Sequence, residues 1–223
     1  MSTQIYSIKT SFNSIINYCY FIRLESTNRI IAIDPSWEFV KISNFISENN
    51  FILSGILLTH SHIDHTNLAD ILSATHKCPV FMSRTESEFY NFHCNNLIHL
   101  HNEDVLLFQG FKIKPMFTPG HTKGGCCYLI DNNFFSGDTL FIEGCGSCQG
   151  NGADPEDMFN SLMKIKSALD IKTKIFPSHC YGRTLGITLE EVLKENIYLQ
   201  FNNLSQFTKF RMRKNQTRNF DFR

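Results

Sequence analysis

Residues 59–65 read THSHIDH and place three histidines and one aspartate directly after an apolar run that is typical of a buried strand. In an extended segment His60 and His62 point to the same side, and a turn after them allows Asp64 and His65 to return towards that point. Imidazole and carboxylate groups are ligands of Zn²⁺ and related metals, and a catalytic zinc site needs only three of them. The segment therefore predicts a metal site with more ligands than one catalytic ion requires.

Three further polar residues each follow a predicted strand. They are His121 in the sequence TPGH, Asp138 in SGDT and His179 in PSHC. Loops at strand ends commonly carry functional residues, and glycine neighbours allow close approach of the backbone to a site. Together with the first cluster they make five histidines and two aspartates, which we expect to meet in one metal centre.

Hydrophobic patterns predict strands that are interleaved with helices along the chain. The predicted strands are Tyr18–Leu24, Arg29–Asp34, Phe51–Leu58, Cys78–Met82, Phe111–Phe117, Cys126–Ile130, Phe134–Phe135 and Lys174–Pro177. The predicted helices are Trp37–Ile46, a short helix capped by Asn67, one with Asp154 as N-cap and Pro155 in its first turn, one with a Thr188/Glu191 capping box and a last helix carrying Leu199–Phe210. Two such series predict two sheets covered by helices, an αββα sandwich.

The composition is that of a folded, enzyme-sized protein. The 223 residues include 21 Lys plus Arg and 21 Asp plus Glu, with 42% hydrophobic and 19% charged residues. This balance argues against a disordered chain and removes the general electrostatic case for binding nucleic acid. The stretch from Ser11 to Ile22 is interrupted by polar residues and fits neither a signal peptide nor a membrane span. We therefore expect a cytoplasmic protein, with no membrane or nucleic-acid partner, whose eight cysteines are free thiols.

The order of these motifs, HxHxDH, then Gly-His, Gly-Asp and a final His, resembles the metallo-β-lactamase superfamily over roughly residues 15–185. Because Asp138 stands where the true β-lactamases have Cys, and Asp64 and His65 are both present, the chain resembles the glyoxalase II branch more closely. It is most similar to the zinc-dependent hydrolases found with trans-acyltransferase polyketide synthases, such as that of the bacillaene pathway. The stretches that carry this likeness are DPSWE at 34–38, GCGSC at 144–148, NIY at 196–198 and FRMRKN at 210–215.

This resemblance implies a four-layer αββα sandwich of class α+β, with a metallo-hydrolase domain over residues 1–185 and a short, basic helical extension over 186–223 packed on it. It also implies two Zn²⁺ ions, with iron or manganese as alternatives, and a hydroxide between the metals as the nucleophile. The family's ligand pattern assigns one ion to His60, His62 and His121, the other to Asp64, His65 and His179, and the bridge to Asp138. Asp64 and Asp138 are the predicted catalytic residues.

By the same resemblance the substrate is an acyl thioester, with a short acyl group on the phosphopantetheine of a polyketide synthase carrier protein. The partner is then an acyl carrier protein or a small thioester, and the oligomeric state stays open. Residues 205–223 hold six basic residues and one acidic residue, whereas the preceding 204 hold 15 and 20. We therefore expect Arg211, Arg213 and Lys214 to meet a phosphate or an acidic carrier surface, and Cys145 to contact substrate from a glycine-rich loop at the edge of the active site.

Two enzymatic alternatives remain open from the sequence. One is glyoxalase II itself, an S-lactoylglutathione hydrolase, although only 44 residues follow His179. The other is a persulfide dioxygenase that binds one Fe²⁺ through His60, His121 and Asp138. A non-catalytic scaffold is the least favoured reading because all seven ligand positions are filled.

Overall fold

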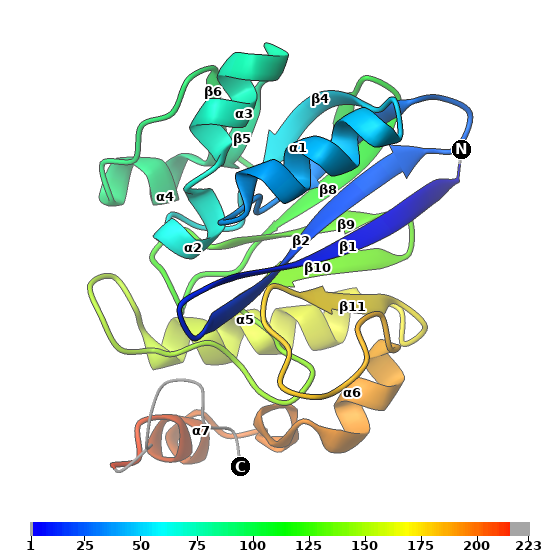
Figure 1. Cartoon of the computed structure of the whole chain (residues 1–223). Coiled ribbons are helices and arrows are strands. Elements are labelled where there is room, and N and C mark those ends of the chain that lie inside the picture. Colours follow the sequence, from blue (N-terminus) through cyan, green and yellow to red (C-terminus); the bar gives the residue numbers. More distant parts are fainter. Residues whose placement is uncertain (1, 215–223) are drawn as a thin grey trace.

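The computed structural model describes residues 2–214, and its strands form two facing sheets with helices on both outer sides (Figure 1). The first sheet, in spatial order, consists of β1 (Thr3–Phe12), β2 (Ile15–Leu24), β3 (Arg29–Ile33), β4 (Ile52–Leu57), β5 (Val80–Ser83) and β6 (Leu97–Leu100). The second, in the order β11-β10-β9-β8-β7, consists of β7 (Leu106–Phe108), β8 (Phe111–Phe117), β9 (Cys126–Ile130), β10 (Asn133–Gly137) and β11 (Lys174–Pro177). The helices are α1 (Phe39–Glu48), α2 (Ile63–Thr66), α3 (Ala69–His76), α4 (Arg84–Phe89), α5 (Pro155–Ala168), α6 (Leu189–Glu195) and α7 (Leu204–Arg211), with a 3₁₀ turn at Ile197–Gln200.

Three apolar layers hold these elements together. Side chains of α1 and α3, such as Ile42 and Leu72, pack on the outer face of the first sheet. Tyr20 and Tyr128 belong to the layer between the two sheets. The third layer joins the outer face of the second sheet to α5, α6 and α7, and it includes Phe207. This arrangement confirms the predicted four-layer αββα sandwich, because each sheet buries both of its faces.

The predicted C-terminal extension lies on the same body in its described part. Residues of α6 and α7 share one apolar layer with α5. Residues 215–223 of the predicted extension lie outside the described part of the chain. Within residues 2–214, none of the helices combines the length and the apolar character needed to cross a bilayer.

Several predicted strand bounds and helix caps agree with the structure residue by residue. The strands β8, β9 and β11 have the predicted bounds, and Asp154 caps α5 by accepting hydrogen bonds from the N–H groups of Glu156 and Asp157. The capping box of α6 is also present, with Thr188 and Glu191 bonded to each other's backbone N–H groups. The sequence patterns did not predict β1, β6, β7 or α4.

Two helix starts were predicted wrongly. The helix expected from Trp37 begins at Phe39, because Trp37 has a φ of +67°, which no α-helical residue adopts. Asn67 is not an N-cap: it ends α2, and its side-chain oxygen accepts the backbone N–H of Trp37. Near the C-terminus, the predicted helix over Leu199–Phe210 is interrupted, since Phe201 has an extended backbone and α7 begins only after Asn203.

The topology brings several strand ends to one edge of the sandwich. Strands β3 and β4 are parallel neighbours in the first sheet, and β10 and β11 are parallel neighbours in the second. Parallel neighbours end on the same side, so the residues that follow them lie close together. The predicted ligands follow β4, β8, β10 and β11.

Candidate metal centre

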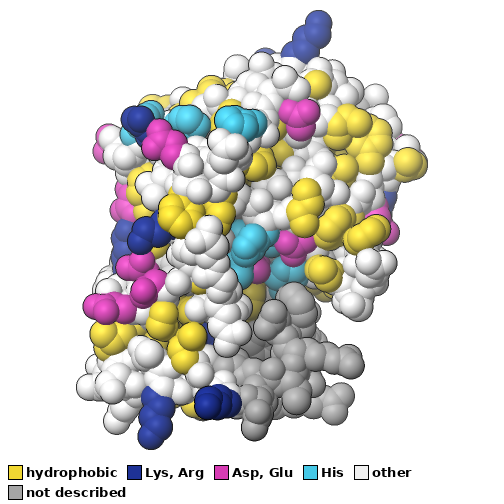
Figure 2. Space-filling view, turned by 90° about the vertical axis from the view of Figure 1, so that its left-hand side faces the viewer, with side chains coloured by type: hydrophobic (Ala, Val, Ile, Leu, Met, Phe, Trp, Pro, Cys, Tyr) yellow, Lys and Arg dark blue, Asp and Glu magenta, His cyan; other side chains and the backbone are white. Residues whose placement is uncertain are grey.

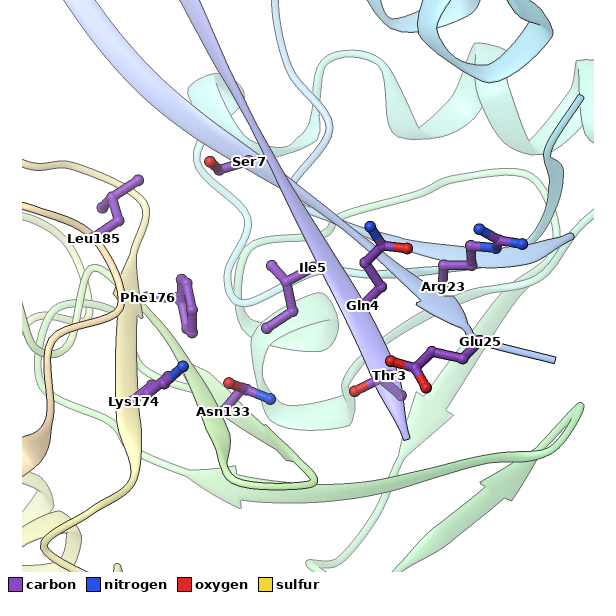
Figure 3. A pocket seen from close by; sticks show the side chains of 10 residues that line it. All are labelled: Thr3, Gln4, Ile5, Ser7, Arg23, Glu25, Asn133, Lys174, Phe176 and Leu185. Carbon is purple, nitrogen blue, oxygen red and sulfur yellow. The ribbon is translucent and has the colours of Figure 1, made fainter. Parts of the chain in front are cut away.

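Two hollows on the surface differ in chemistry. Figure 2 shows histidine side chains gathered beside acidic ones in the middle of one face, where a pocket of about 210 Å³ is lined by His62, Asp64 and Asp138 among others. A larger groove of about 730 Å³ lies beside β1 and β11 and is lined by mixed polar groups such as Arg23 and Lys174 (Figure 3). Among the described residues, the two hollows share no lining residue; five of the seven predicted ligands line the smaller one, and none lines the larger one. Side-chain chemistry rather than size therefore identifies the smaller pocket as the candidate site.

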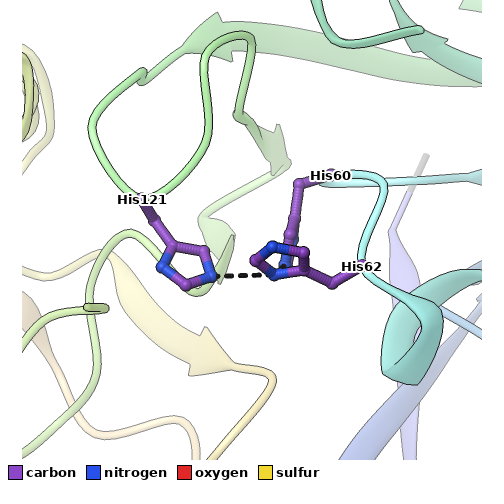
Figure 4. Close-up of side chains that lie close together, drawn as sticks. All are labelled: His60, His62 and His121. Atoms are coloured by element: carbon purple, nitrogen blue, oxygen red, sulfur yellow. Dashed lines mark hydrogen bonds between the residues drawn. The ribbon is translucent and has the colours of Figure 1, made fainter. Parts of the chain in front are cut away.

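Three histidines form a first triad, His60, His62 and His121, on the loops that follow β4 and β8 (Figure 4). The Nδ1 atom of His62 lies 3.0 Å from Nε2 of His60 and 3.1 Å from Nε2 of His121. Each ring thus directs one nitrogen towards a common point, as the ligands of a single cation must.

A second triad consists of Asp64, His65 and His179. The Oδ2 atom of Asp64 lies 3.5 Å from Nε2 of His65 and 3.4 Å from Nε2 of His179. Asp64 and His65 belong to α2, whose single turn follows His62, so the chain folds back after the first triad as the sequence predicts.

Asp138 stands between the two triads. Its Oδ2 atom lies 3.5 Å from Nε2 of His121, and its Oδ1 atom lies 3.5 Å from Nε2 of both His65 and His179. Gly137 allows this position: its φ is +51°, and a Cβ at this residue would overlap the side chain of Thr59. One carboxylate therefore presents one oxygen to each triad.

The spacing of the ligand atoms fits metal coordination. Tetrahedral bonds of ~2.0–2.1 Å place neighbouring ligand atoms ~3.3–3.4 Å apart, and the separations within and between the triads are 3.0–3.5 Å. Among the described residues, the buried atoms Nε2 of His65 and Oδ1 of Asp138 have no hydrogen-bond partner. Buried polar atoms normally have partners, so their position here is that of atoms that serve a cation.

Four of the five ligand histidines use their second ring nitrogen, Nδ1, in a hydrogen bond to a neighbouring group. Nδ1–H of His121 donates to the carbonyl of Ser147 at 2.8 Å, and Nδ1–H of His179 donates to that of Ile16 at 2.6 Å. These bonds fix the tautomer and leave the lone pair on Nε2 for a metal.

Asp34 orients the remaining two of these four histidines, His65 and His60. Its Oδ2 atom accepts Nδ1–H of His65 at 2.9 Å and the hydroxyl of Thr59 at 2.6 Å. Since the Thr59 hydroxyl donates to Asp34, its oxygen accepts Nδ1–H of His60, 3.0 Å away. Asp34 thus supports one ligand of each triad, directly for His65 and through Thr59 for His60.

Burial lowers the pKa of His60 well below its usual value, and the neighbouring imidazoles lower it further. The same causes lower the pKa of His62. For His121, burial outweighs the attraction of Asp138 and also lowers the pKa. The first triad is therefore neutral at pH 7 and presents free lone pairs, as metal ligands must.

The second triad is more strongly polarised. Burial opposes the charged form of His65, but Asp64 and Asp138 outweigh it and raise the pKa of this imidazole well above its usual value. Burial of His179 is outweighed in the same way, mainly by Asp138, and its pKa is raised. Burial alone would raise the pKa of Asp64, but His65 and His179 hold it below its ordinary range. A cation that binds here would therefore displace protons from imidazole groups.

A second buried carboxylate, Glu86 at the start of α4, joins the loops of the first triad. Its Oε1 atom accepts the N–H and the hydroxyl of Ser61 at 2.8 Å, and its Oε2 atom accepts the N–H of Gly124 at 2.8 Å. Sequence patterns did not identify Glu86 or assign a role to Asp34. The sequence feature that could have pointed to Asp34 is its position at the end of a predicted strand, because the predicted ligands also lie at strand ends.

The predicted substrate contacts lie away from the pocket lining. Arg211 is 5% exposed, and its Nε–H donates to the carbonyl of Gly146 at 2.9 Å. The guanidinium of Arg213 lies 4.0 Å from the ring centre of Phe210, and Lys214 is exposed. Cys145 is fully buried, and all eight cysteines are free, as predicted. The role of these four residues in substrate binding stays a prediction.

The sequence model of the metallo-beta-lactamase superfamily matches residues 15–179, which include both triads and Asp138. In three dimensions the chain resembles the crystal structure of ETHE1 from Myxococcus xanthus, with a TM-score of 0.84 and 22% identity over 97% of this chain and 93% of that one. At this identity the likeness concerns the fold.

Two curated relatives match almost end to end. BaeB of Bacillus velezensis, named a probable polyketide biosynthesis zinc-dependent hydrolase, is 44% identical over 99% of this chain and 98% of its own length. PksB of Bacillus subtilis, which has the same description, is 40% identical over 100% and 99%. A hydroxyacylglutathione hydrolase of Prochlorococcus marinus is 28% identical over 85% and 88%.

Proposed function

Since the chain belongs to the metallo-beta-lactamase superfamily, we propose that it is a metal-dependent hydrolase that uses two zinc ions to cleave acyl thioesters. The observation that carries this proposal is the place of Asp138, with one oxygen 3.5 Å from a ligand nitrogen of the first triad and the other 3.5 Å from two of the second. A carboxylate in this position suits a pair of cations better than one.

Two zinc ions held by these residues would supply an activated water at neutral pH and a Lewis acid for the substrate carbonyl. The protein's own contribution is to hold the ligands in place and in the right protonation state. Asp34, Ser147 and Ile16 fix the tautomers of the ligand imidazoles, directly or through Thr59. Because a water activated by the metals would attack the substrate carbonyl, no side-chain nucleophile is required.

The pocket walls fit a small acyl group. Ile15 and Phe141 line the pocket together with the ligands, and the volume of about 210 Å³ is below the ~300–1,000 Å³ of typical small-molecule sites. Such a pocket accommodates the thioester end of a substrate and leaves the rest of a long carrier arm outside. We propose that the substrates are short acyl groups on the phosphopantetheine of polyketide synthase carrier proteins, because BaeB and PksB, which match the whole chain, are named for polyketide biosynthesis.

The test is hydrolysis of acetyl groups from an acetyl-loaded carrier protein, followed by mass spectrometry of the intact carrier, together with elemental analysis of the enzyme. We expect two zinc equivalents per chain and loss of the acetyl mass, and we expect His62→Ala to abolish turnover. Full activity of His62→Ala, or activity with less than one metal equivalent, would contradict the proposal.

The two alternatives give different results in matched assays. Rapid turnover of S-lactoylglutathione, with the acetyl carrier left intact, would favour glyoxalase II. Oxygen consumption with glutathione persulfide and one iron per chain would favour the dioxygenase, which needs His60, His121 and Asp138 but not His62. The position of His62 Nδ1, within 3.1 Å of a nitrogen of both other rings, supports a three-histidine site instead.

A further inference from the structure

Asn17, a buried residue of β2, lies between an indole and a predicted metal ligand. It is 1% exposed. Its side-chain oxygen lies 2.8 Å from Nε1 of Trp37. Its side-chain nitrogen lies 2.8 Å from the carbonyl oxygen of Asp64 and 3.3 Å from Oδ2 of the same residue. One amide therefore contacts both the backbone and the carboxylate of Asp64.

The indole determines which way this amide points. An indole N–H donates a hydrogen bond and accepts none, so the atom of Asn17 that faces Trp37 must be the oxygen. The NH₂ group of Asn17 must then face Asp64, where both atoms in reach are acceptors. With the amide reversed, an NH₂ group would oppose the indole N–H and an oxygen would oppose two oxygens of Asp64. Trp37 thus makes Asn17 a donor towards the second triad.

Trp37 is itself held in an unusual conformation. Its φ of +67° lies in the left-handed region that bulky side chains rarely adopt. Its backbone N–H donates to the side-chain oxygen of Asn67 at 3.0 Å, and its ring stacks on Phe12 with centres 4.9 Å apart and planes 20° apart. These contacts hold the indole N–H directed at Asn17.

We propose that Asn17 is a positioning residue for Asp64, and that Trp37 keeps Asn17 in the orientation that this role requires. The bond to Oδ2 places this oxygen, which faces both His65 and His179, and the bond to the carbonyl fixes the turn that carries it. Within residues 2–214, the side-chain hydrogen bonds of Asn17 reach no residue of the first triad, so its effect belongs to the second metal position. The proposal rests on the two-metal function proposed above.

The experiment measures zinc affinity by competition with a chromophoric chelator, at both equivalents, in the full chain. Asn17→Ala is expected to weaken the second equivalent ~10–100-fold, as loss of a bond to a metal ligand does, and to leave the first unchanged. Trp37→Phe keeps an aromatic ring but lacks the N–H, and it should weaken the second equivalent to a smaller extent. Asn132→Ala is the matched control. The side chain of Asn132 also donates to a backbone carbonyl, that of Lys172, and accepts from the hydroxyl of Thr173, but neither partner is a predicted metal ligand.

Fluorescence gives a readout that a purely structural role would not change. Trp37 is the only tryptophan of the chain. We expect its emission to change with the second zinc equivalent in the wild type and in Asn132→Ala, and to lose this response in folded Asn17→Ala. Unchanged affinity and fluorescence response in Asn17→Ala would overturn the proposal for Asn17. If this variant does not fold, unchanged second-site affinity in Trp37→Phe overturns it. If the wild type binds only one zinc equivalent, the two-metal function fails. If it binds two and Asn17→Ala leaves the second unchanged, only the proposal for Asn17 fails, so the two failures are distinguishable.

Discussion

Replacement of Asp34 by Asn tests whether a buried carboxylate organises both triads at once. Asp34 accepts four hydrogen bonds: Oδ1 accepts the N–H of Thr59 at 2.8 Å, and Oδ2 accepts the hydroxyls of Thr59 and Ser178 and Nδ1–H of His65. It has a φ of +48°, a conformation that Asn adopts as readily as Asp. The change therefore alters the hydrogen bonds and the charge without adding backbone strain.

The size of the effect follows from what an amide can accept. If the new NH₂ group replaces Oδ2, it faces three donors. If it replaces Oδ1, it faces only the N–H of Thr59, but this buried N–H then loses its partner, which costs ~1–3 kcal/mol. In either orientation His65 loses a charged acceptor, and loss of such a partner typically weakens metal binding 10–100-fold, or ~1.4–2.7 kcal/mol. Because the Thr59 hydroxyl also supports His60, we expect weaker binding at both metal positions, unlike the effect of Asn17→Ala.

The assay is chelator competition for both zinc equivalents, with thermal unfolding in excess chelator as a separate measure of stability. For a chain of this size each kcal/mol shifts the melting temperature by ~2–4 °C. Asp131→Asn is the matched control, since Asp131 also has a positive φ, +52°, and accepts one side-chain bond, from Thr3, away from the site. Wild-type affinity at both equivalents and an unchanged melting temperature in Asp34→Asn would refute this reasoning.

Two further substitutions and one labelling experiment test other parts of the site and its surroundings. Glu86→Gln places an NH₂ group against one of the donors that now meet a carboxylate, so we expect the free energy of unfolding in urea to fall by ~1–3 kcal/mol and one zinc equivalent to bind more weakly; unchanged stability would contradict the role of Glu86 in joining the loops of the first triad. Gly146→Ala puts a Cβ against the carbonyl oxygen of Asp138, so we expect at least a tenfold loss of kcat/KM for the acyl carrier, and wild-type kinetics would exclude this packing constraint. Burial raises the pKa of Cys148 to about 11 and that of Cys145 still further, so at pH 8 only ~0.1% or less of either is thiolate. Iodoacetamide should therefore label these two thiols only after unfolding, as peptide mass spectrometry would show, and native labelling would speak for an accessible pair.

Much of the fold was predictable because its central elements carry local signals. The strand Phe111–Phe117 lies between turn residues and buries alternate side chains, and the cap at Asp154 is encoded within four residues. Thr3–Phe12 gave no comparable signal, since β1 lies at an edge of its sheet and most of its side chains are partly or fully exposed. The helix start at Trp37 was mispredicted because its positive φ is set by contacts with Phe12, Asn17 and Asn67, which are far away in the sequence.

The candidate site also combines residues that local sequence patterns identify with residues that only distant contacts bring into place. Histidine and aspartate at strand ends are recognisable by residue type and spacing, so the sequence could propose the seven ligands. The residues that orient these ligands have no such signature. Asp34 meets Thr59 25 positions later, Glu86 meets Ser61 25 positions earlier, and Asn17 meets Asp64 at a separation of 47. Each depends on which donors the fold brings to it, and only the assembled sandwich determines that.

The proposed pair of divalent cations would account for carboxylates, instead of neutral acceptors, at Asp34 and Glu86. Two divalent cations would bring four positive charges, whereas the seven ligands include only two carboxylates, Asp64 and Asp138. A third carboxylate among the ligands would improve the balance but would occupy a coordination position that a water needs. Asp34 and Glu86 lie one hydrogen bond behind the ligand loops, so each adds negative charge in a buried environment without taking such a position. Removing either charge should therefore weaken metal binding even though neither group touches a metal, and the amide variants, which preserve size, are the substitutions that separate charge from packing.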